Sequence, residues 1–174
     1  ADSALTIKMY NTVATGSNGN SISNQLNHIT SGVQNKVATS VSSNRSRRYG
    51  SIAQRNKATV IEFYQKLFGD KDVSAVDQYI SKDYIQHNPS VADGREALKT
   101  AVTQWFAGAP KDTVDIQHAA AEGDLVFLHI RGKNQTGGLQ TVIDIFKLKD
   151  GLIVEHWDAI QDVPATSLND HPMF

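Results

Sequence analysis

Residues 113–161 read TVDIQHAAAEGDLVFLHIRGKNQTGGLQTVIDIFKLKDGLIVEHWDAIQ, and their pattern gives the clearest indication of the fold. Apolar side chains alternate with polar ones along four segments of it, which is typical of strands with one buried face. Polar connectors rich in Gly and Asp separate the segments and predict hairpin turns. The stretch therefore predicts a four-stranded antiparallel meander, with strands over 113–121, 125–133, 139–149 and 152–161.

Three segments with helical periodicity precede these strands. Apolar residues recur every three or four positions over 60–68, 73–80 and 97–106. A brief extended segment over 83–87 lies between the second and third of them and stops at Asn88-Pro89. Helices followed by a meander predict an α+β layer in which the helices cover one face of the sheet. A curled sheet covered in this way leaves a pocket at its open end.

The composition of the chain argues against several classes of function. The chain has 174 residues, with 17 basic and 18 acidic side chains, and no Cys. A balanced charge favours neither a nucleic acid nor a membrane surface as partner. The absence of Cys excludes disulfides and thiol catalysis. No run of 18 apolar residues is present, so we expect no membrane span.

The first 50 residues differ from the rest, and we expect two parts, 1–50 and 51–174. Ser, Thr and Asn fill 21 of these 50 positions, with five basic residues and one acid. Such a segment buries little apolar surface by itself. Three interpretations stand: a flexible leader, an arm that packs on a neighbouring subunit, and a removable pro-segment. The chain begins at Ala1 rather than Met, which favours a secreted or periplasmic protein; the alternative is a cytoplasmic one.

Ionisable residues interrupt the apolar stripes of three predicted strands. By alternation, His156 and Asp158 share a face of the last strand, Asp144 lies on a face of the strand before it, and His129 lies on one face of 125–133. We expect the three strands to present these groups, His129 and Asp144 included, on one apolar surface. Burial of an unpaired charge there would cost several kcal/mol, so these groups must pair, change protonation state or line a hydrated cavity.

Asp beside His in a partly dry cavity is suited to general acid–base chemistry. Asp158 is the first candidate for the proton-transferring group and His87 for its partner; His129, His156 and Asp144 follow. No close-spaced ligand motif predicts a metal, and no cofactor is expected. The candidates for ligand contacts are aromatic, as expected for an apolar pocket: Phe63, Tyr84, Trp105, Phe127, Phe146 and Trp157.

Several ordered motifs resemble the SnoaL-like polyketide cyclase family. The early ones are the segments 84–89 and 93–98, and the closing ones are 144–146, Asp150-Gly151 and 153–158, with Met173-Phe174 at the end. The resemblance covers residues 51–174. It implies a nuclear transport factor 2-like cone with a ligand pocket, and a homo-oligomer formed as a dimer through the sheet. In the family's cyclases an Asp and a His catalyse an aldol condensation without a cofactor, and Asp158 and His87 are the matching positions.

Two functions of different classes follow. The first is acid–base catalysis on a small carbonyl-containing or polyketide-like ligand, through aldol condensation, cyclisation or isomerisation. The second is a non-catalytic secreted protein that binds or self-assembles, with residues 1–50 docked on a neighbouring subunit and further assembly through them.

Overall fold

The structure is a computed structural model that describes residues 50–134 and 136–174. The predicted N-terminal part, 1–50, lies outside these residues except for its last position. A helix runs through residues 50–64 and continues as a π-helical turn. The further elements, in chain order, are η1 (Gln65–Gly69), α2 (Ala75–Tyr79), β1 (Ile80–Gln86), α3 (Arg95–Trp105), β2 (Asp115–Glu122), β3 (Leu125–Lys133), β4 (Leu139–Lys149) and β5 (Leu152–Asp162).

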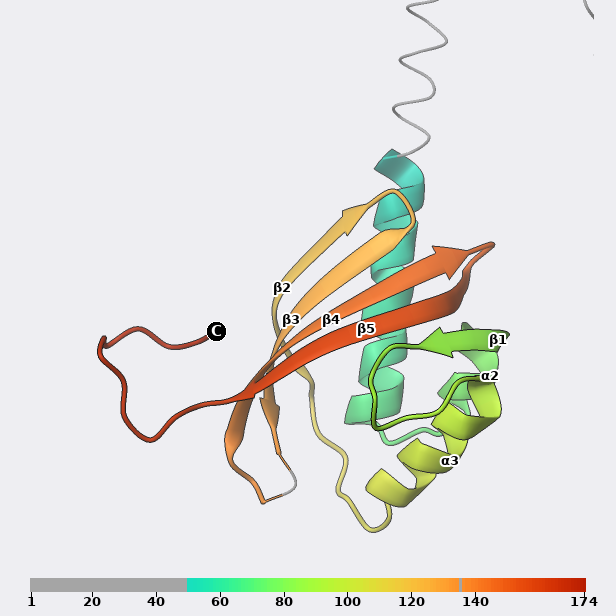
Figure 1. The fold of residues 1–174 in the computed structure, drawn as a ribbon. Helices are drawn as coiled ribbons and strands as arrows, with labels where there is room; N and C mark the ends of the chain where they lie inside the picture. The colour runs from blue at the N-terminus through green and yellow to red at the C-terminus, as the bar shows by residue number, and fades with distance from the viewer. Residues whose placement is uncertain (1–49, 135) are drawn as a thin grey trace, which may run out of the picture. The chain divides into compact units, whose positions relative to one another are not determined.

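The five strands form one curved sheet in the order β1-β5-β4-β3-β2 (Figure 1). The pairs β2–β3, β3–β4 and β4–β5 are antiparallel, which confirms the predicted meander. Strand β1 adds a fifth member, parallel to β5. The segment predicted as briefly extended is thus a full edge strand, and it begins earlier than expected, at Ile80.

Hairpin turns fix the register of the meander. At the β4–β5 turn, Asp150 and Gly151 both adopt positive φ angles, 52° and 83°. An Asp-Gly pair with two positive φ angles suits the two-residue turn whose twist matches that of the flanking strands. A bulge between Lys147 and Leu148 sets Glu155 opposite Lys147, while the turn itself places Ile153 opposite Leu148. Ile153 is fully buried as a result, whereas Leu152 is exposed.

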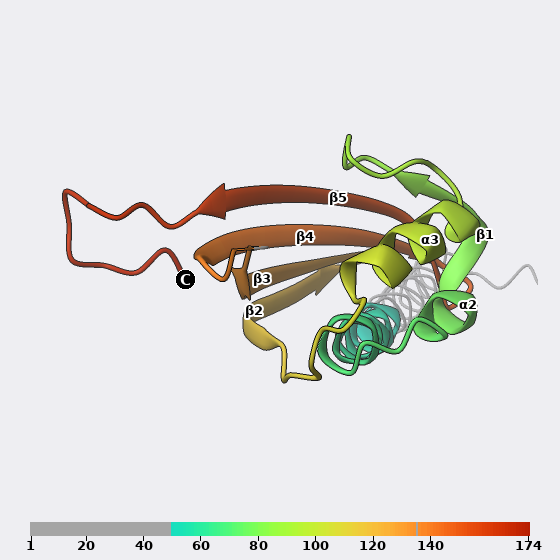
Figure 2. The ribbon, with the colours of Figure 1, turned by 90° about the horizontal axis from the view of Figure 1, so that it is seen from below.

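The helices cover one face of the sheet, as predicted, and the core lies between the two layers (Figure 2). From the helical side Val60, Phe63 and Leu67 are almost fully buried. From β3 the buried side chains are Val126, Leu128 and Ile130. The residues of β3 that alternate with these three, His129 among them, therefore point to the opposite face of the sheet. This differs from the arrangement expected from the sequence, which placed His129 on the face of Asp144.

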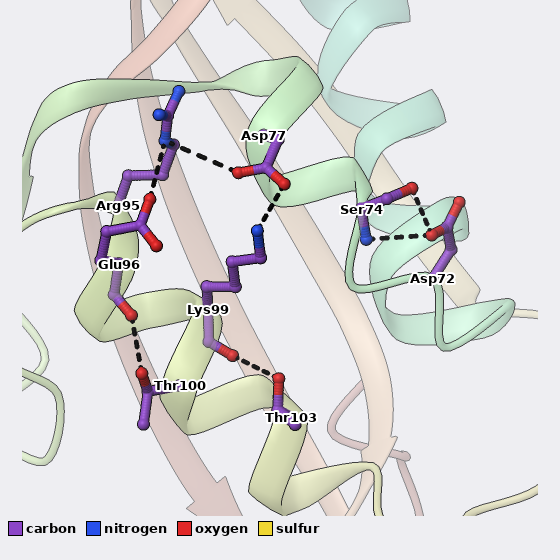
Figure 3. A network of polar contacts seen from close by, with 8 residues as sticks. All are labelled: Asp72, Ser74, Asp77, Arg95, Glu96, Lys99, Thr100 and Thr103. Carbon is purple, nitrogen blue, oxygen red and sulfur yellow. Dashed lines mark hydrogen bonds and ion pairs between the residues drawn. The ribbon is translucent and has the colours of Figure 1, made fainter.

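Polar contacts join the short helices at their exposed surface (Figure 3). The carboxylate of Asp77 on α2 accepts a hydrogen bond from Lys99 of α3 and lies 3.8 Å from Nε of Arg95. Asp72 accepts hydrogen bonds from the backbone and hydroxyl of Ser74 just before α2. Exposed ion pairs contribute at most about 1 kcal/mol each. Their role here is to fix how α3 lies beside α2.

The C-terminal tail folds back on the sheet face opposite the helices. The hydroxyl of Thr141 donates to the carbonyl of Met173, and Arg131 lies over the ring of Phe174. Thr141 also contacts His129 Nε2 at 2.9 Å. Within the described part of the chain, no helix is long and apolar enough to cross a membrane.

Candidate functional site

A cavity of about 170 Å³ lies between the helical layer and the sheet. Strands β1, β4 and β5 and the loop after β1 supply most of its polar side chains, and the first helix, η1 and α3 supply most of its apolar wall. Its lining consists of Phe63, Tyr64, Leu67, Phe68, Tyr84, Gln86, Asn88, Val91, Leu98, Trp105, Val142, Asp144, Phe146, His156, Asp158 and Ile160. No Lys or Arg occurs among these residues of the described chain.

Strand register brings three ionisable groups together in the cavity. In the β4–β5 ladder Asp144 lies opposite Asp158, and Phe146 lies opposite His156. His156 therefore reaches Asp144 diagonally, with Nε2 2.9 Å from Asp144 Oδ1. Asp144 and His156 are only 4% and 9% exposed. Both are buried polar groups, and both are fully engaged in hydrogen bonds.

Tyr64 completes the partners of Asp144. Its hydroxyl donates to Asp144 Oδ2 over 2.9 Å. Burial, followed by the charge of Asp144 and this hydrogen bond, raises the pKa of Tyr64 well above its usual value of 10. Tyr64 therefore remains a proton donor at any physiological pH.

Asp158 is held by Asn88, two residues beyond the end of β1. Asn88 Nδ2 donates to Asp158 Oδ2 over 2.6 Å, while Asn88 Oδ1 accepts from the backbone N–H of Ser90. The backbone contact fixes which end of the amide faces Asp158. Asp158 Oδ1 accepts no hydrogen bond from any other described residue. This oxygen is available to a ligand.

Tyr84 presents a second available group. Its oxygen accepts a hydrogen bond from Gln86 Nε2 over 3.1 Å, which leaves its own proton without an acceptor among the described residues. Burial and, after it, the charges of Asp144 and Asp158 raise the pKa of Tyr84. The hydroxyl therefore stays protonated and can donate to a ligand oxygen.

The predicted site residues fall into two groups. Those that line the cavity are Asp158, Asp144, His156, Phe63, Tyr84, Trp105 and Phe146. Those that do not are His87, His129, Phe127 and Trp157. His87 is 41% exposed, contacts Glu155 at 2.9 Å and stacks on Trp157 with ring centroids 4.6 Å apart.

Three polar residues of the cavity were not among the predicted site residues: Tyr64, Gln86 and Asn88. A signal for two of them exists in the sequence. Tyr84, Gln86 and Asn88 are spaced two apart on an extended segment, so they share a face, and His87 must point the other way. Tyr64 comes from a helix 80 positions away in sequence from its partner, and no local pattern reveals that contact.

A metal would have to compete with hydrogen bonds already formed. The ligand atoms of Asp144, His156 and Asp158 lie within 4.8 Å of one another. However, both nitrogens of His156 and both oxygens of Asp144 are engaged. Only Asp158 has an uncommitted oxygen, and a single carboxylate is a weak metal site.

The stability of the fold should depend on Tyr64 in alkaline solution. The unfolded chain releases the tyrosine proton near pH 10, while the folded chain retains it, so the folded state binds more protons above that pH. The free energy of unfolding should therefore fall as the pH rises above 10. In Tyr64→Phe this fall should be shallower by up to about 1.4 kcal/mol per pH unit, measured by urea unfolding. Equal slopes for both proteins between pH 10 and 11.5 would contradict the assignment.

Comparison with known proteins identifies the family. The model of the SnoaL-like domain matches residues 60–156. The chain belongs to the SnoaL-like domain family. No curated protein matches this SnoaL-like chain.

Solved structures share the fold of this SnoaL-like domain. A proposed polyketide cyclase from Acidithiobacillus ferrooxidans is 19% identical, with a TM-score of 0.50 over 61% of this chain and 87% of that one. A proposed ketosteroid isomerase from Kribbella flavida is 12% identical, with a TM-score of 0.54 over 67% and 85%. A SnoaL-like protein of unknown function from Burkholderia thailandensis is 14% identical, with a TM-score of 0.53 over 62% and 96%. These likenesses show the nuclear transport factor 2-like fold, and the function must be argued from the cavity.

Proposed function

We propose that this SnoaL-like domain binds a small enolisable carbonyl compound and moves a proton at the carbon next to the carbonyl group. Asp158 is the base and Tyr84 the donor to the carbonyl oxygen. The observation that carries the proposal is that a carboxylate oxygen of Asp158 and the hydroxyl proton of Tyr84 are both uncommitted and face one largely apolar cavity. An apolar cavity strengthens both the base and the hydrogen bond to a developing negative charge.

The proposed step is balanced within the site. The C–H bond breaks, its proton goes to Asp158 Oδ1, and its electron pair moves through the new C=C bond onto the carbonyl oxygen. Tyr84 stabilises that enolate oxygen by a hydrogen bond. Return of the proton to another carbon would isomerise the ligand. Alternatively, the enolate carbon attacks a second carbonyl carbon of the same molecule, whose C=O π bond breaks, and the alkoxide so formed takes back the proton from Asp158, which closes a ring in the manner of an aldol reaction.

His87 has no part in this proposal, although it was the first candidate for the partner of Asp158. Its ring lies against Trp157 and Glu155 and not in the cavity lining. Asn88, the next residue, takes the contact with Asp158 instead. Tyr84, whose hydroxyl proton has no acceptor among the described residues, then supplies the donor in the same cavity.

A hydrogen-exchange experiment tests the proposal without knowledge of the natural ligand. Wild-type protein in D₂O should accelerate the exchange of α-protons of cyclic ketones, beginning with cyclohexanone, measured by ¹H NMR. In Tyr84→Phe the accelerated rate should fall by about 10²- to 10³-fold, because one oxyanion donor is lost. Tyr79→Phe is the matched control, since the Tyr79 hydroxyl bonds to Lys66 and does not line the cavity.

The outcomes separate the two functional classes. A fall in Tyr84→Phe with an unchanged rate in Tyr79→Phe supports enolisation in the cavity. A wild-type rate equal to that of buffer for every ketone in the series would contradict it and favour a binding role.

A further inference from the structure

Gln86 joins three other residues of the cavity lining through hydrogen bonds: Tyr84, Asn88 and His156. The backbone N–H of Asn88 donates to Gln86 Oε1 over 3.0 Å, and Gln86 Nε2 donates to the oxygen of Tyr84 over 3.1 Å. A reversed amide would set its NH₂ group against the N–H of Asn88, donor against donor. A backbone N–H cannot act as an acceptor, so the orientation of Gln86 is fixed: Oε1 faces Asn88.

The orientation of Gln86 decides the protonation of His156. His156 Nδ1 lies 2.8 Å from the same Gln86 Oε1. An amide oxygen only accepts, so His156 Nδ1 must carry a hydrogen. His156 Nε2 then faces Asp144 Oδ1 at 2.9 Å. A neutral ring protonated at Nδ1 has a lone pair at Nε2, which would be repelled by a carboxylate lone pair.

Two arrangements remove that repulsion, and both hold the same number of protons. Either His156 is an imidazolium and Asp144 a carboxylate, or His156 is neutral and Asp144 is a carboxylic acid that donates to Nε2. In each case one proton lies between the two residues and the pair has no net charge. Tyr64 cannot supply that proton, because its hydroxyl donates to the other oxygen of Asp144.

The charges that line the cavity also favour a proton held between His156 and Asp144. Asp144 and Asp158 face one another across the β4–β5 ladder, and no Lys or Arg lines the cavity within the described residues. Outside the cavity lining, Glu155 of β5 lies within ion-pair distance of both His87 and Lys147. A buried carboxylate facing a second, partly buried one without a cation would be costly. A proton held by His156 and Asp144 reduces the charge of the cavity to that of Asp158 alone.

We propose that Gln86 is a positioning residue that keeps a proton stored between His156 and Asp144, so that Asp158 is the single anionic base of the cavity. Gln86 does this through the acceptor it presents to His156 Nδ1. The catalytic consequence rests on the proposed function. The stored proton itself does not, because it can be observed in the protein without any ligand.

The test is ¹⁵N NMR of His156 in selectively labelled full-length protein at pH 7. In the wild type, Nδ1 should be protonated, and either Nε2 or the facing Asp144 should hold the second proton. A neutral ring with hydrogen only on Nε2 and a bare Nδ1 would overturn the proposal, whatever the exchange assay shows.

Three variants connect the signal to Gln86. Gln86→Met removes the acceptor, so the ring should lose the Nδ1 hydrogen and take the Nε2–H tautomer. Gln86→Glu keeps an oxygen facing Asn88 and should retain the Nδ1 hydrogen, which a purely structural role would not predict. Gln161→Met makes the same change at an exposed position of β5 and should leave the His156 spectrum unaltered. An unshifted spectrum in folded Gln86→Met would also overturn the proposal.

Discussion

Asp158→Asn is expected to reduce the accelerated exchange of ketone α-protons by about 10²- to 10⁴-fold, the range that a positioned general base contributes. An amide cannot accept the proton at neutral pH, so the step loses its base while the cavity keeps its shape. The fold should be retained, since the amide oxygen of the substituted side chain can still accept the hydrogen bond from Asn88. Exchange rates by ¹H NMR and the free energy of unfolding in urea measure the two effects separately.

Asp162→Asn provides the matched control for this change. Asp162 lies four residues further along β5, is exposed, and accepts hydrogen bonds from Asn134 and Gln140 rather than from a cavity residue. Its variant should exchange ketone protons at the wild-type rate. Equal exchange rates in Asp158→Asn and the wild type would remove Asp158 from the role of base.

The strands of the meander could be predicted from the sequence because their connectors and their alternation agree. Asp150-Gly151 is a strong local hairpin signal, and the polar residues of β4 and β5 interrupt otherwise apolar faces. Asp144, His156 and Asp158 could be placed on one surface from the sequence for that reason. Strand β1 was harder to predict, because its partner β5 lies about 70 residues away and their parallel pairing leaves no hairpin signal.

Strand β3 shows where alternation alone cannot decide. Apolar residues occupy both faces of this strand, with Leu125 and Phe127 on one and Val126, Leu128 and Ile130 on the other. A shift of one residue exchanges the faces, and the hydrophobic pattern tolerates either choice. Only the packing of the helices selects the second set for burial. His129 therefore lies near the C-terminal tail.

The same principle explains the position of His87. Alternation along the extended segment sets Tyr84 and Gln86 on one face, and the sheet turns that face towards the helices. The family resemblance directed attention to His87 as an imidazole, while the residue that touches Asp158 is an amide, Asn88. The residue type of His87 suggested an acid–base partner for Asp158, but the alternation of side chains along the extended segment directs Asn88, and not His87, towards Asp158.

The largest stability effect is expected from removing one member of the buried His156–Asp144 pair. In His156→Leu the carboxyl group of Asp144 keeps the hydrogen bond from Tyr64 but loses the imidazole that balances its charge, inside an apolar cavity where an uncompensated charge is costly. Breaking a buried pair in this way typically costs about 3–5 kcal/mol. The free energy of unfolding in urea at pH 7 should fall by that amount. Ile160→Leu, at a half-exposed position on the same face of β5, should change it by less than about 1.5 kcal/mol.

The double variant Asp144→Leu/His156→Leu tests whether the loss is due to the orphaned group rather than to the volume of the imidazole. With both members replaced by apolar side chains no charge is left unpaired, and such replacements are often neutral or stabilising. Tyr64 loses its acceptor in the double variant, so recovery should be partial. We expect the double variant to be more stable than His156→Leu and the coupling energy of the cycle to be about 0.5–3 kcal/mol. Strict additivity of the two single losses would mean that His156 and Asp144 do not act as a pair, and it would also remove the basis for a proton stored between them.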